Sequence, residues 1–200
     1  CLSGVGQNQG MKRTLLFALA LIAVGSGHAD AQARQSLGDL VQRGDTYLTP
    51  GTLEPYTGPV VLMQSPNMVG MWASLRNGKF HGLHELYHDN GQLSRKITYK
   101  DGLEDGPSES YFENGQLLVA TTYKDGEFHG EHVRYFENRQ LWWRVAYQNG
   151  EFHGPQEWYE ESGELRQKGS YDMGNRCGEW IQYGRSQTYP PCPPGLEDGN

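Results

Sequence analysis

The sequence lacks the features of an enzyme, a membrane-spanning protein or a nucleic-acid-binding protein. Its apolar run from Leu15 to Val24 is well short of the roughly 20 residues that a membrane-spanning helix needs. Lys and Arg number 17 against 24 Asp and Glu, a net charge of -7, whereas nucleic acids and anionic membranes favour basic surfaces. No nucleophile elbow, zinc-protease helix or phosphate loop occurs. We therefore expect no catalysis, no cofactor and no nucleic-acid partner, and the net charge disfavours a membrane surface.

The first part of the chain predicts export. Lys12 and Arg13 precede the apolar run, and Ala31-Gln32-Ala33 follows it, which is the layout of a secretory signal peptide over residues 11–33. A signal anchor is the alternative, but the apolar run is short for one. Residues 1–10 are expected to be upstream or fragment residues outside the fold. The expected location is periplasmic or extracellular, in a bacterium.

Cysteine is scarce, with three in the chain, of which Cys177 and Cys192 follow the predicted signal peptide. An even number of cysteines in an oxidising compartment predicts a disulfide between them. Two free thiols are the alternative.

What the sequence does contain is a repeat of 24 residues. Tyr99, Tyr123, Tyr147 and Tyr171 recur at that interval, and a fixed period of this length indicates one supersecondary element that stacks on its neighbours. The repeated structural positions are Tyr87, Gly91, Leu93, Tyr99, Gly102, Gly106, Tyr111, Gly115, Leu117, Tyr123, Gly126, Gly130, Tyr135, Leu141, Tyr147, Gly150, Gly154, Tyr159, Gly163, Leu165 and Tyr171.

Each repeat predicts a β-hairpin, because two strand-type runs are each followed by Asn-Gly or Asp-Gly. The expected fold is all-β: an elongated antiparallel meander of hairpin repeats that forms a single-layer twisted sheet or solenoid. We place N-terminal capping strands at 34–57, the repeat array at 58–184 and a proline-rich tail at 185–200.

Alternation along the strands assigns the faces of this sheet. Leu93, Ile97 and Tyr99 share parity and are expected to form one apolar stripe. If Tyr87 belongs to the same stripe and lies opposite Leu93, the loop is Asp89-Asn90-Gly91, three residues that end in a left-handed glycine. Arg139 occupies that glycine position one repeat later, so we expect a distorted turn there.

The motif Tyr-x-x-Gly-x-x-x-Gly, as at residues 147–154, resembles MORN repeats. The second half of each unit, as in Tyr-Phe-Glu-Asn-Gly-Gln-Leu at 111–117, resembles the MORN variants of the bacterial YwqK-type toxin-antitoxin system antitoxin family. The resemblance covers residues 38–184. It implies an antitoxin that neutralises a partner protein by binding it, or a scaffold or lipid-associated module.

Histidines and glutamates that recur in the repeats could form metal or acid-base sites, but the distance between strands argues against both. Equivalent strands of neighbouring repeats are about 10 Å apart, too far to share one metal or to form a catalytic carboxylate pair. We therefore expect His81, His129 and His153 to stabilise turns through local backbone bonds. The remaining members of the set are expected to be solvated, namely His84, His88, His132, Glu85, Glu109 and Glu157.

Tryptophan and arginine gather in the C-terminal repeats. By parity, Trp142, Trp158 and Trp180 are expected on the face opposite the tyrosine stripe, with Arg134 over Trp142 and Arg166 over Trp158 in cation-π pairs. These five residues are the candidate partner surface, since Trp and Arg often anchor interfaces. The alternative is that the sheet curls or gains a second layer and buries the rings.

The sequence thus predicts a non-catalytic protein-interaction module, antitoxin-like or scaffold-like, exported to the cell envelope. Its partner is an unknown protein, either a toxin or an envelope protein. The alternative function is that of an envelope repeat protein that associates with membrane lipid or binds glycan.

Overall fold

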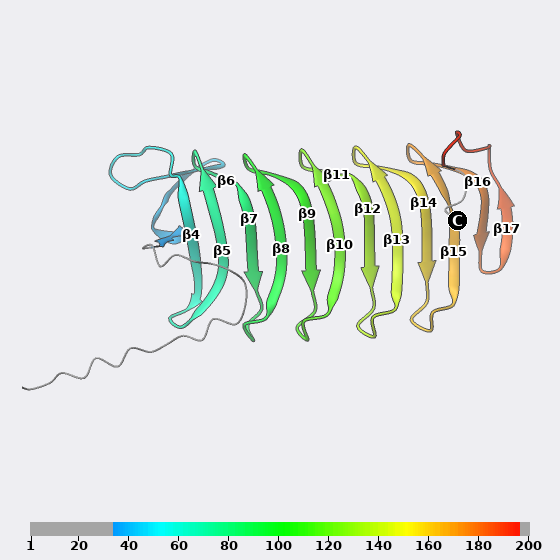
Figure 1. Cartoon of the computed structure of the whole chain (residues 1–200), viewed down its shortest axis with the longest axis horizontal. Coiled ribbons are helices and arrows are strands. Elements are labelled where there is room, and N and C mark those ends of the chain that lie inside the picture. The colour runs from blue at the N-terminus through cyan, green and yellow to red at the C-terminus, as the bar shows by residue number, and fades with distance from the viewer. Residues whose placement is uncertain (1–33, 197–200) are drawn as a thin grey trace, which may run out of the picture. The chain divides into compact units, whose positions relative to one another are not determined.

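One long antiparallel sheet dominates the molecule. The structure, a computed structural model, describes residues 34–196, so residues 1–10, the predicted signal peptide and the last four residues of the predicted tail lie outside it. The main strands stand side by side in chain order (Figure 1). Among the described residues no helix is long and apolar enough to cross a membrane. The predicted all-β meander of hairpin repeats is confirmed.

The strands of the main sheet follow the 24-residue period. The interrupted pairs β6/β7 and β11/β12 flank His81 and His129. The strands are β1 (Gln35–Ser36), β4 (Gly58–Ser65), β5 (Met68–Arg76), β6 (Lys79–Phe80), β7 (Gly82–Tyr87), β8 (Leu93–Lys100), β9 (Leu103–Tyr111), β10 (Leu117–Lys124), β11 (Glu127–Phe128), β12 (Gly130–Tyr135), β13 (Leu141–Gln148), β14 (Glu151–Tyr159), β15 (Leu165–Asp172), β16 (Asn175–Gln182) and β17 (Arg185–Thr188).

Two-residue turns join the repeats at one end of the strands. Asp101 and Gly102, between β8 and β9, both have positive φ, 51° and 91°, as a hairpin turn of this kind requires. The Gly102 amide points at the preceding repeat and donates to the carbonyl of Phe80 at 2.8 Å. The same bond recurs one repeat later, from Gly126 to Glu104. Each turn is therefore tied to the repeat before it.

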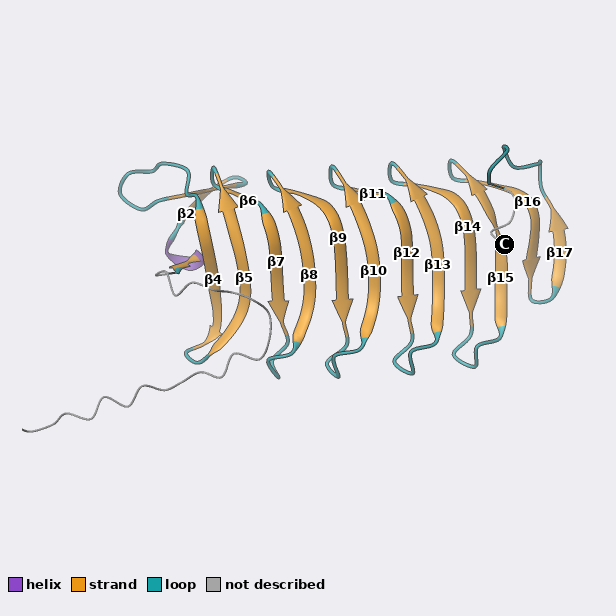
Figure 2. Ribbon diagram, in the orientation of Figure 1, coloured by secondary structure: helices purple, strands orange, loops and turns teal. Residues whose placement is uncertain are grey.

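Three-residue loops close the hairpins at the other end (Figure 2). Tyr87 pairs with Leu93, and the Gly91 amide donates to the His88 carbonyl at 2.8 Å with φ at 81°. This is the loop predicted from the sequence. The Asn90 side chain then donates to the Glu113 carbonyl of the next repeat at 2.8 Å. Both ends of the strands thus carry bonds between repeats.

The expectation of a distorted turn at Arg139 was wrong. Arg139 takes a left-handed φ of 70°, and its amide donates to the Phe136 carbonyl at 2.9 Å, as a glycine does in the other repeats. The neighbouring Asn138 side chain donates to the Glu161 carbonyl of the next loop at 3.2 Å. The hydrogen bonds of the Arg139 amide and the Asn138 side chain hold the loop closed. Arg139 therefore adopts the strained left-handed conformation, and the loop keeps the geometry of the other repeats.

A β-bulge beside each three-residue loop changes the predicted faces. Leu86 pairs with Arg95 while Tyr87 pairs with Leu93, so β8 has one extra residue at this point. Paired residues share a face, and the extra residue reverses the alternation. Tyr87 and Leu93 therefore lie on the face opposite Ile97 and Tyr99, and the single stripe predicted from parity is wrong. The same shift recurs at Tyr111, Tyr135 and Tyr159.

A small hydrophobic core closes the N-terminal end. The short helix η1 (Leu37–Asp39) and the hairpin of β2 (Val41–Arg43) and β3 (Thr46–Leu48) lie here, where the sequence predicted capping strands. The core residues are Leu40, Val60, Met71, Ala73 and Leu75. At the other end β17 extends the sheet past residue 184, into the segment predicted as tail.

His84 is buried beside this core, with 7% of its surface exposed, so the expectation that it is solvated was wrong. Its ring stacks on Phe80 with 4.8 Å between centroids and lies 5.3 Å from the Tyr99 ring. Neither ring nitrogen has a hydrogen-bond partner among the described residues. Burial, with a smaller effect of Arg95, lowers the pKa of His84 to about 4.

Arg139→Gly should stabilise the protein by about 1 kcal/mol, because glycine takes positive φ without the clash of a Cβ. The free energy of unfolding in urea measures this effect. The matched exchange Gly115→Arg, at the equivalent position one repeat earlier, should destabilise by a similar amount. A destabilised Arg139→Gly variant would contradict the strain described here.

Stability should fall in acid through His84. The unfolded chain takes up this proton near pH 6.5 and the folded chain near 4, so the unfolded state binds more protons between these values. The stabilisation is complete above about pH 6.5 and is lost as the pH falls toward 4. Thermal unfolding midpoints across this range should vary less in His84→Phe than in the parent. Burial also lowers the pKa of His132, so the unfolding midpoint of the double variant His84→Phe/His132→Phe should vary with pH less still. If the midpoint depends on pH equally in the parent and in both variants, these histidines do not cause the loss of stability in acid.

Candidate partner-binding site

One face of the sheet carries a row of aromatic rings in contact with one another, some stacked, some tilted and the last pair edge-to-face. Successive ring centroids along this row are 4.7 to 5.0 Å apart. The row consists of Tyr123, Phe128, Tyr147, Phe152, Tyr171 and Trp180. Rings at these separations add stabilisation beyond their buried area. The row therefore gives the C-terminal repeats the packing that a single-layer sheet otherwise lacks.

Glu104 interrupts the row of rings. It occupies the repeat position of Phe80, Phe128 and Phe152. Its carboxylate accepts from Arg95 at 3.2 Å and from the Tyr99 hydroxyl at 3.4 Å. A charged, hydrogen-bonded cluster thus separates the N-terminal rings from the C-terminal row.

An open groove lies on this aromatic face over the C-terminal repeats. Trp143 of β13 pairs with Trp158 of β14, and the Trp143 ring contacts Phe152 of the row at 6.1 Å between centroids. Trp142 and Tyr171 also line the groove, which has a volume of about 390 Å³. The three indoles are half-buried. No second layer covers them among the described residues, so the alternative of a fully buried patch does not apply to them.

Arginines stack on two of these indoles. The guanidinium carbon of Arg134 lies 4.1 Å from the Trp142 ring centroid, and that of Arg166 lies 4.5 Å from Trp158. The structure thus contains both predicted cation-π contacts. Their predicted face was wrong, because Trp142 and Arg166 are the extra residues of two bulges. All four residues lie on the same face as Tyr147 and Tyr171, not opposite to it.

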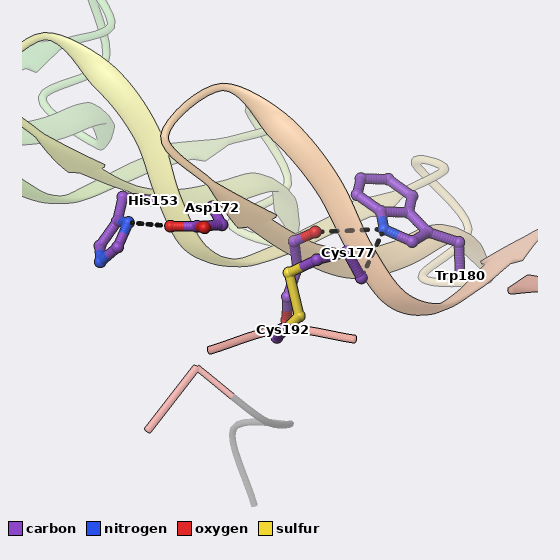
Figure 3. The surroundings of a disulfide bond; sticks show 6 residues. His153, Asp172, Cys177, Trp180 and Cys192 are labelled. Carbon is purple, nitrogen blue, oxygen red and sulfur yellow. Dashed lines mark hydrogen bonds and ion pairs between the residues drawn. A yellow bond between two sulfur atoms is a disulfide. The ribbon is translucent and has the colours of Figure 1, made fainter. Parts of the chain in front are cut away.

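Trp180 does not belong to the accessible surface, contrary to the prediction. Only 1% of it is exposed, and its indole nitrogen donates to the carbonyls of Ser170 and Cys177 at 3.1 Å each (Figure 3). The ring lies over Gly169, where an added Cβ would be 2.2 Å from the indole. Because glycine has no Cβ, Gly169 leaves room for the Trp180 ring. The spacing of the tryptophans along the sequence could not predict this contact between two strands.

A disulfide holds the C-terminal segment against this buried tryptophan. Cys177 and Cys192 are bonded (Figure 3). The Gly178 amide donates to the Pro190 carbonyl at 2.8 Å, and the Tyr189 ring lies 6.2 Å from that of Trp180. The segment closes the C-terminal end of the aromatic row.

The opposite face is covered by charge pairs. Arg144 binds Glu157 at 2.6 Å, and Lys168 lies 3.8 Å from the same carboxylate. Tyr87 and Tyr111 donate to Glu85 and Glu109 at 3.1 and 2.6 Å. These glutamates are partly or fully buried and hydrogen-bonded, so the expectation that Glu85, Glu109 and Glu157 are solvated was wrong. Most of the charges named here have a partner of opposite charge or a hydroxyl donor on the same face.

The recurring histidines form no metal centre. Among residues 34–196 no cluster of three or more potential ligands exists. The His81 ring accepts from the Asp101 amide at 3.3 Å, and Asp105 at the same repeat position accepts from the Asp125 amide at 3.2 Å. The His81 imidazole thus binds backbone, as expected, but in the turn of the next repeat. The expectation was wrong for His129 and His153, whose Nδ1 atoms have no hydrogen-bond partner among the described residues. His88 contacts the Tyr111 carbonyl at 2.9 Å, and His132 is half-buried; neither is a solvated residue as predicted.

Sequence reasoning missed five groove residues. Trp143, Gln156, Gln167, Tyr171 and Arg176 all line the groove, but only Tyr171 was singled out, as a structural position. Trp143 follows Trp142 directly, and under strict alternation one ring of such a pair must lie on the tyrosine face, which is a signal that sequence reasoning passed over. Arg176 takes the repeat position of the phenylalanines, which is a second signal.

The MORN repeat variant family matches residues 80–101, 104–125 and 152–173. These three stretches of the chain are MORN repeats of this variant type. The matched units begin 24 and then 48 residues apart, and residues 128–149, with Arg139 in their loop, fill the place between the second and third matches. No curated protein matches the chain. One solved structure, titled "Crystal structure of GtfA/B complex bound to UDP and GlcNAc", matches with 13% identity and a TM-score of 0.26 over 56% of this chain and 22% of that one.

Replacing both Cys177 and Cys192 by serine should lower the free energy of unfolding by about 3 kcal/mol, because the disulfide closes a loop of 15 residues. Urea denaturation with tryptophan fluorescence measures this change. A reductant should destabilise the parent equally and leave the variant unchanged. Equal stability of the parent and the variant would show that the segment is held by packing alone.

Proposed function

We propose that this MORN-repeat protein is an exported, non-catalytic interaction module that binds a partner protein through the aromatic groove. An antitoxin-like or scaffold-like role follows from such binding. MORN repeats are in general interaction modules. The predicted signal peptide at 11–33 supports export to the envelope.

The observation that carries this proposal is the accessible indole cluster. Trp142, Trp143 and Trp158 leave apolar surface open in one groove, between the covered ends of the aromatic face. Clustered tryptophans beside arginines are the composition of interface hot spots. Burying this surface against a partner would provide the driving force for association.

The two other functions considered from the sequence receive less support. An arginine already covers one ring face of Trp142 and of Trp158, and those faces are what a sugar ring would stack on. The opposite face of the sheet pairs its charges internally, so it offers no basic patch to anionic lipid. A protein partner could instead pack against the exposed edges of the indole rings and of the guanidinium groups, so it fits the groove better than a sugar ring or a lipid surface.

The proposal is tested by affinity capture with the full chain from envelope and secreted fractions of its source. The double variant Trp143→Ala/Trp158→Ala should retain at least tenfold less of a stoichiometric partner, because anchor residues at the centre of an interface dominate its affinity. Circular dichroism and thermal unfolding check that the variant remains folded.

Trp72→Ala is the matched control. Trp72 also stacks with an arginine, Arg34 at 4.0 Å, but it pairs with Glu85 and so lies on the opposite face. This variant should capture the partner as the parent does. Equal loss in both variants, or no loss in the groove variant, would overturn the proposed site.

A further inference from the structure

The groove carries positive charge in an acidic protein. Arg134 and Arg176 both line it, whereas no carboxylate does among the described residues. The whole chain has a net charge of -7. The groove is thus a local site for an anionic group on a molecule that otherwise repels one.

Both arginines are held in place by rings and lack a carboxylate partner, although Arg176 donates from one terminal nitrogen to the Tyr189 hydroxyl at 3.1 Å. Arg134 lies 4.1 Å over Trp142 and Arg176 lies 4.3 Å over Trp180. Within residues 34–196 neither has a carboxylate partner, while Arg95, Arg144 and Arg166 have one. A guanidinium stacked by its face presents its edge, which binds carboxylates in a bidentate manner.

Arg134 also has an unmet hydrogen bond. Its Nε is shielded from solvent and has no partner among the described residues. A shielded donor without an acceptor is costly. Because Nε is shielded in the free protein, a ligand carboxylate would bind at the terminal nitrogens, and it would remove this cost only where the guanidinium turns on binding to expose Nε.

The positions of the arginines set the length of the ligand. Arg134 lies on β12 and Arg176 on β16, four strand spacings apart, or about 19 Å at about 4.8 Å each. The pairing register also offsets them along the strands, because Arg134 is level with Gln167 and Arg176 with Tyr171, so their Cα atoms are about 23 Å apart. An extended peptide advances about 3.3 Å per residue. Both side chains reach into one groove, so their guanidinium groups are closer together than their Cα atoms, and two acidic side chains separated by three to five residues, about 13 to 20 Å of extended chain, would reach both.

The floor between the arginines fits the middle of such a peptide. Trp143, Trp158 and Tyr171 offer apolar contact. The amides of Gln156 and Gln167, 5% and 6% exposed, line the same floor. A primary amide both donates and accepts, so it matches a peptide backbone.

We propose that the groove binds an extended acidic segment of the partner protein, with one carboxylate at Arg134, a second at Arg176 and apolar residues between them. This inference rests on the proposed function and specifies the chemistry of its partner. The electrostatic contacts set orientation and register, and the indoles provide the buried area.

A random peptide library displayed on phage and selected on the full chain tests this chemistry. We expect enriched peptides to carry two acidic residues with three to five residues between them, apolar ones among these. Binding of a selected peptide should weaken at least tenfold in Arg134→Gln and in Arg176→Gln, and should weaken with added salt. Arg43→Gln, an exposed arginine of β2 away from the groove, is the control and should bind as the parent does.

A double-mutant cycle then assigns the ends of the peptide. Each acidic residue of the peptide is replaced in turn by its amide, and the affinity is measured for the parent and for both arginine variants. If an acid binds Arg134, its replacement should weaken binding to Arg176→Gln but not weaken binding to Arg134→Gln any further; the converse holds for an acid that binds Arg176. Enriched peptides without paired acids, or affinities unchanged in both arginine variants, would overturn the inference. So would a failure to select peptides while the chain binds glycans on an array or anionic vesicles of phosphatidylserine and phosphatidylcholine.

The failure of this inference is distinguishable from that of the proposed function. If partner capture depends on Trp143 and Trp158 but not on Arg134 or Arg176, the groove is the interface and the acidic segment is wrong. If capture is independent of the tryptophans, the groove itself is the wrong surface.

Discussion

The array depends on hydrogen bonds that the turns make to the repeat before them. A sheet of one layer buries little apolar surface, so its neighbouring hairpins need other contacts to fix their spacing. The Gly102 and Gly126 amides, each donating to a carbonyl 22 residues earlier, supply this contact at one end of the strands. Asn90 and Asn138 supply it at the other end. An inserted residue would move donor and acceptor out of line, which explains why the 24-residue period does not drift.

The turns were predictable from the sequence and the faces were not. Asn-Gly and Asp-Gly pairs specify backbone conformation directly, so the hairpins and the three-residue loop at Gly91 followed from local steric rules. Trp142 and Arg166 were assigned to the wrong face because a bulge adds one residue without leaving a mark in the spacing. The burial of Trp180 depends on Gly169 in the neighbouring strand, a contact that no single strand contains.

The two faces of the sheet differ in how much unpaired surface they leave open. On one face, carboxylates are met by Arg144, Lys168 and the tyrosine hydroxyls, which leaves few groups for a ligand. On the other, the β2–β3 hairpin packs Tyr47 against Phe80 at one end, and the disulfide-bonded segment covers Trp180 at the other. The caps leave the Trp143 region open between them. The open part of this face thus coincides with the repeats that have the bulkiest aromatic residues, which is where the proposed partner would bind.

The meander has a consequence for how the chain folds. Each strand of the repeat array pairs with its neighbours in the sequence, so most contacts join residues fewer than about 24 positions apart. Such a low contact order is unusual among all-β proteins, whose long-range pairings slow their folding. Ordering can begin at any hairpin and spread outward in both directions. In a growing polypeptide, each new strand can pair with the edge of the preceding hairpin as soon as that hairpin has emerged. The bond between Cys177 and Cys192 forms last, because its cysteines are the last part of the folded chain to emerge.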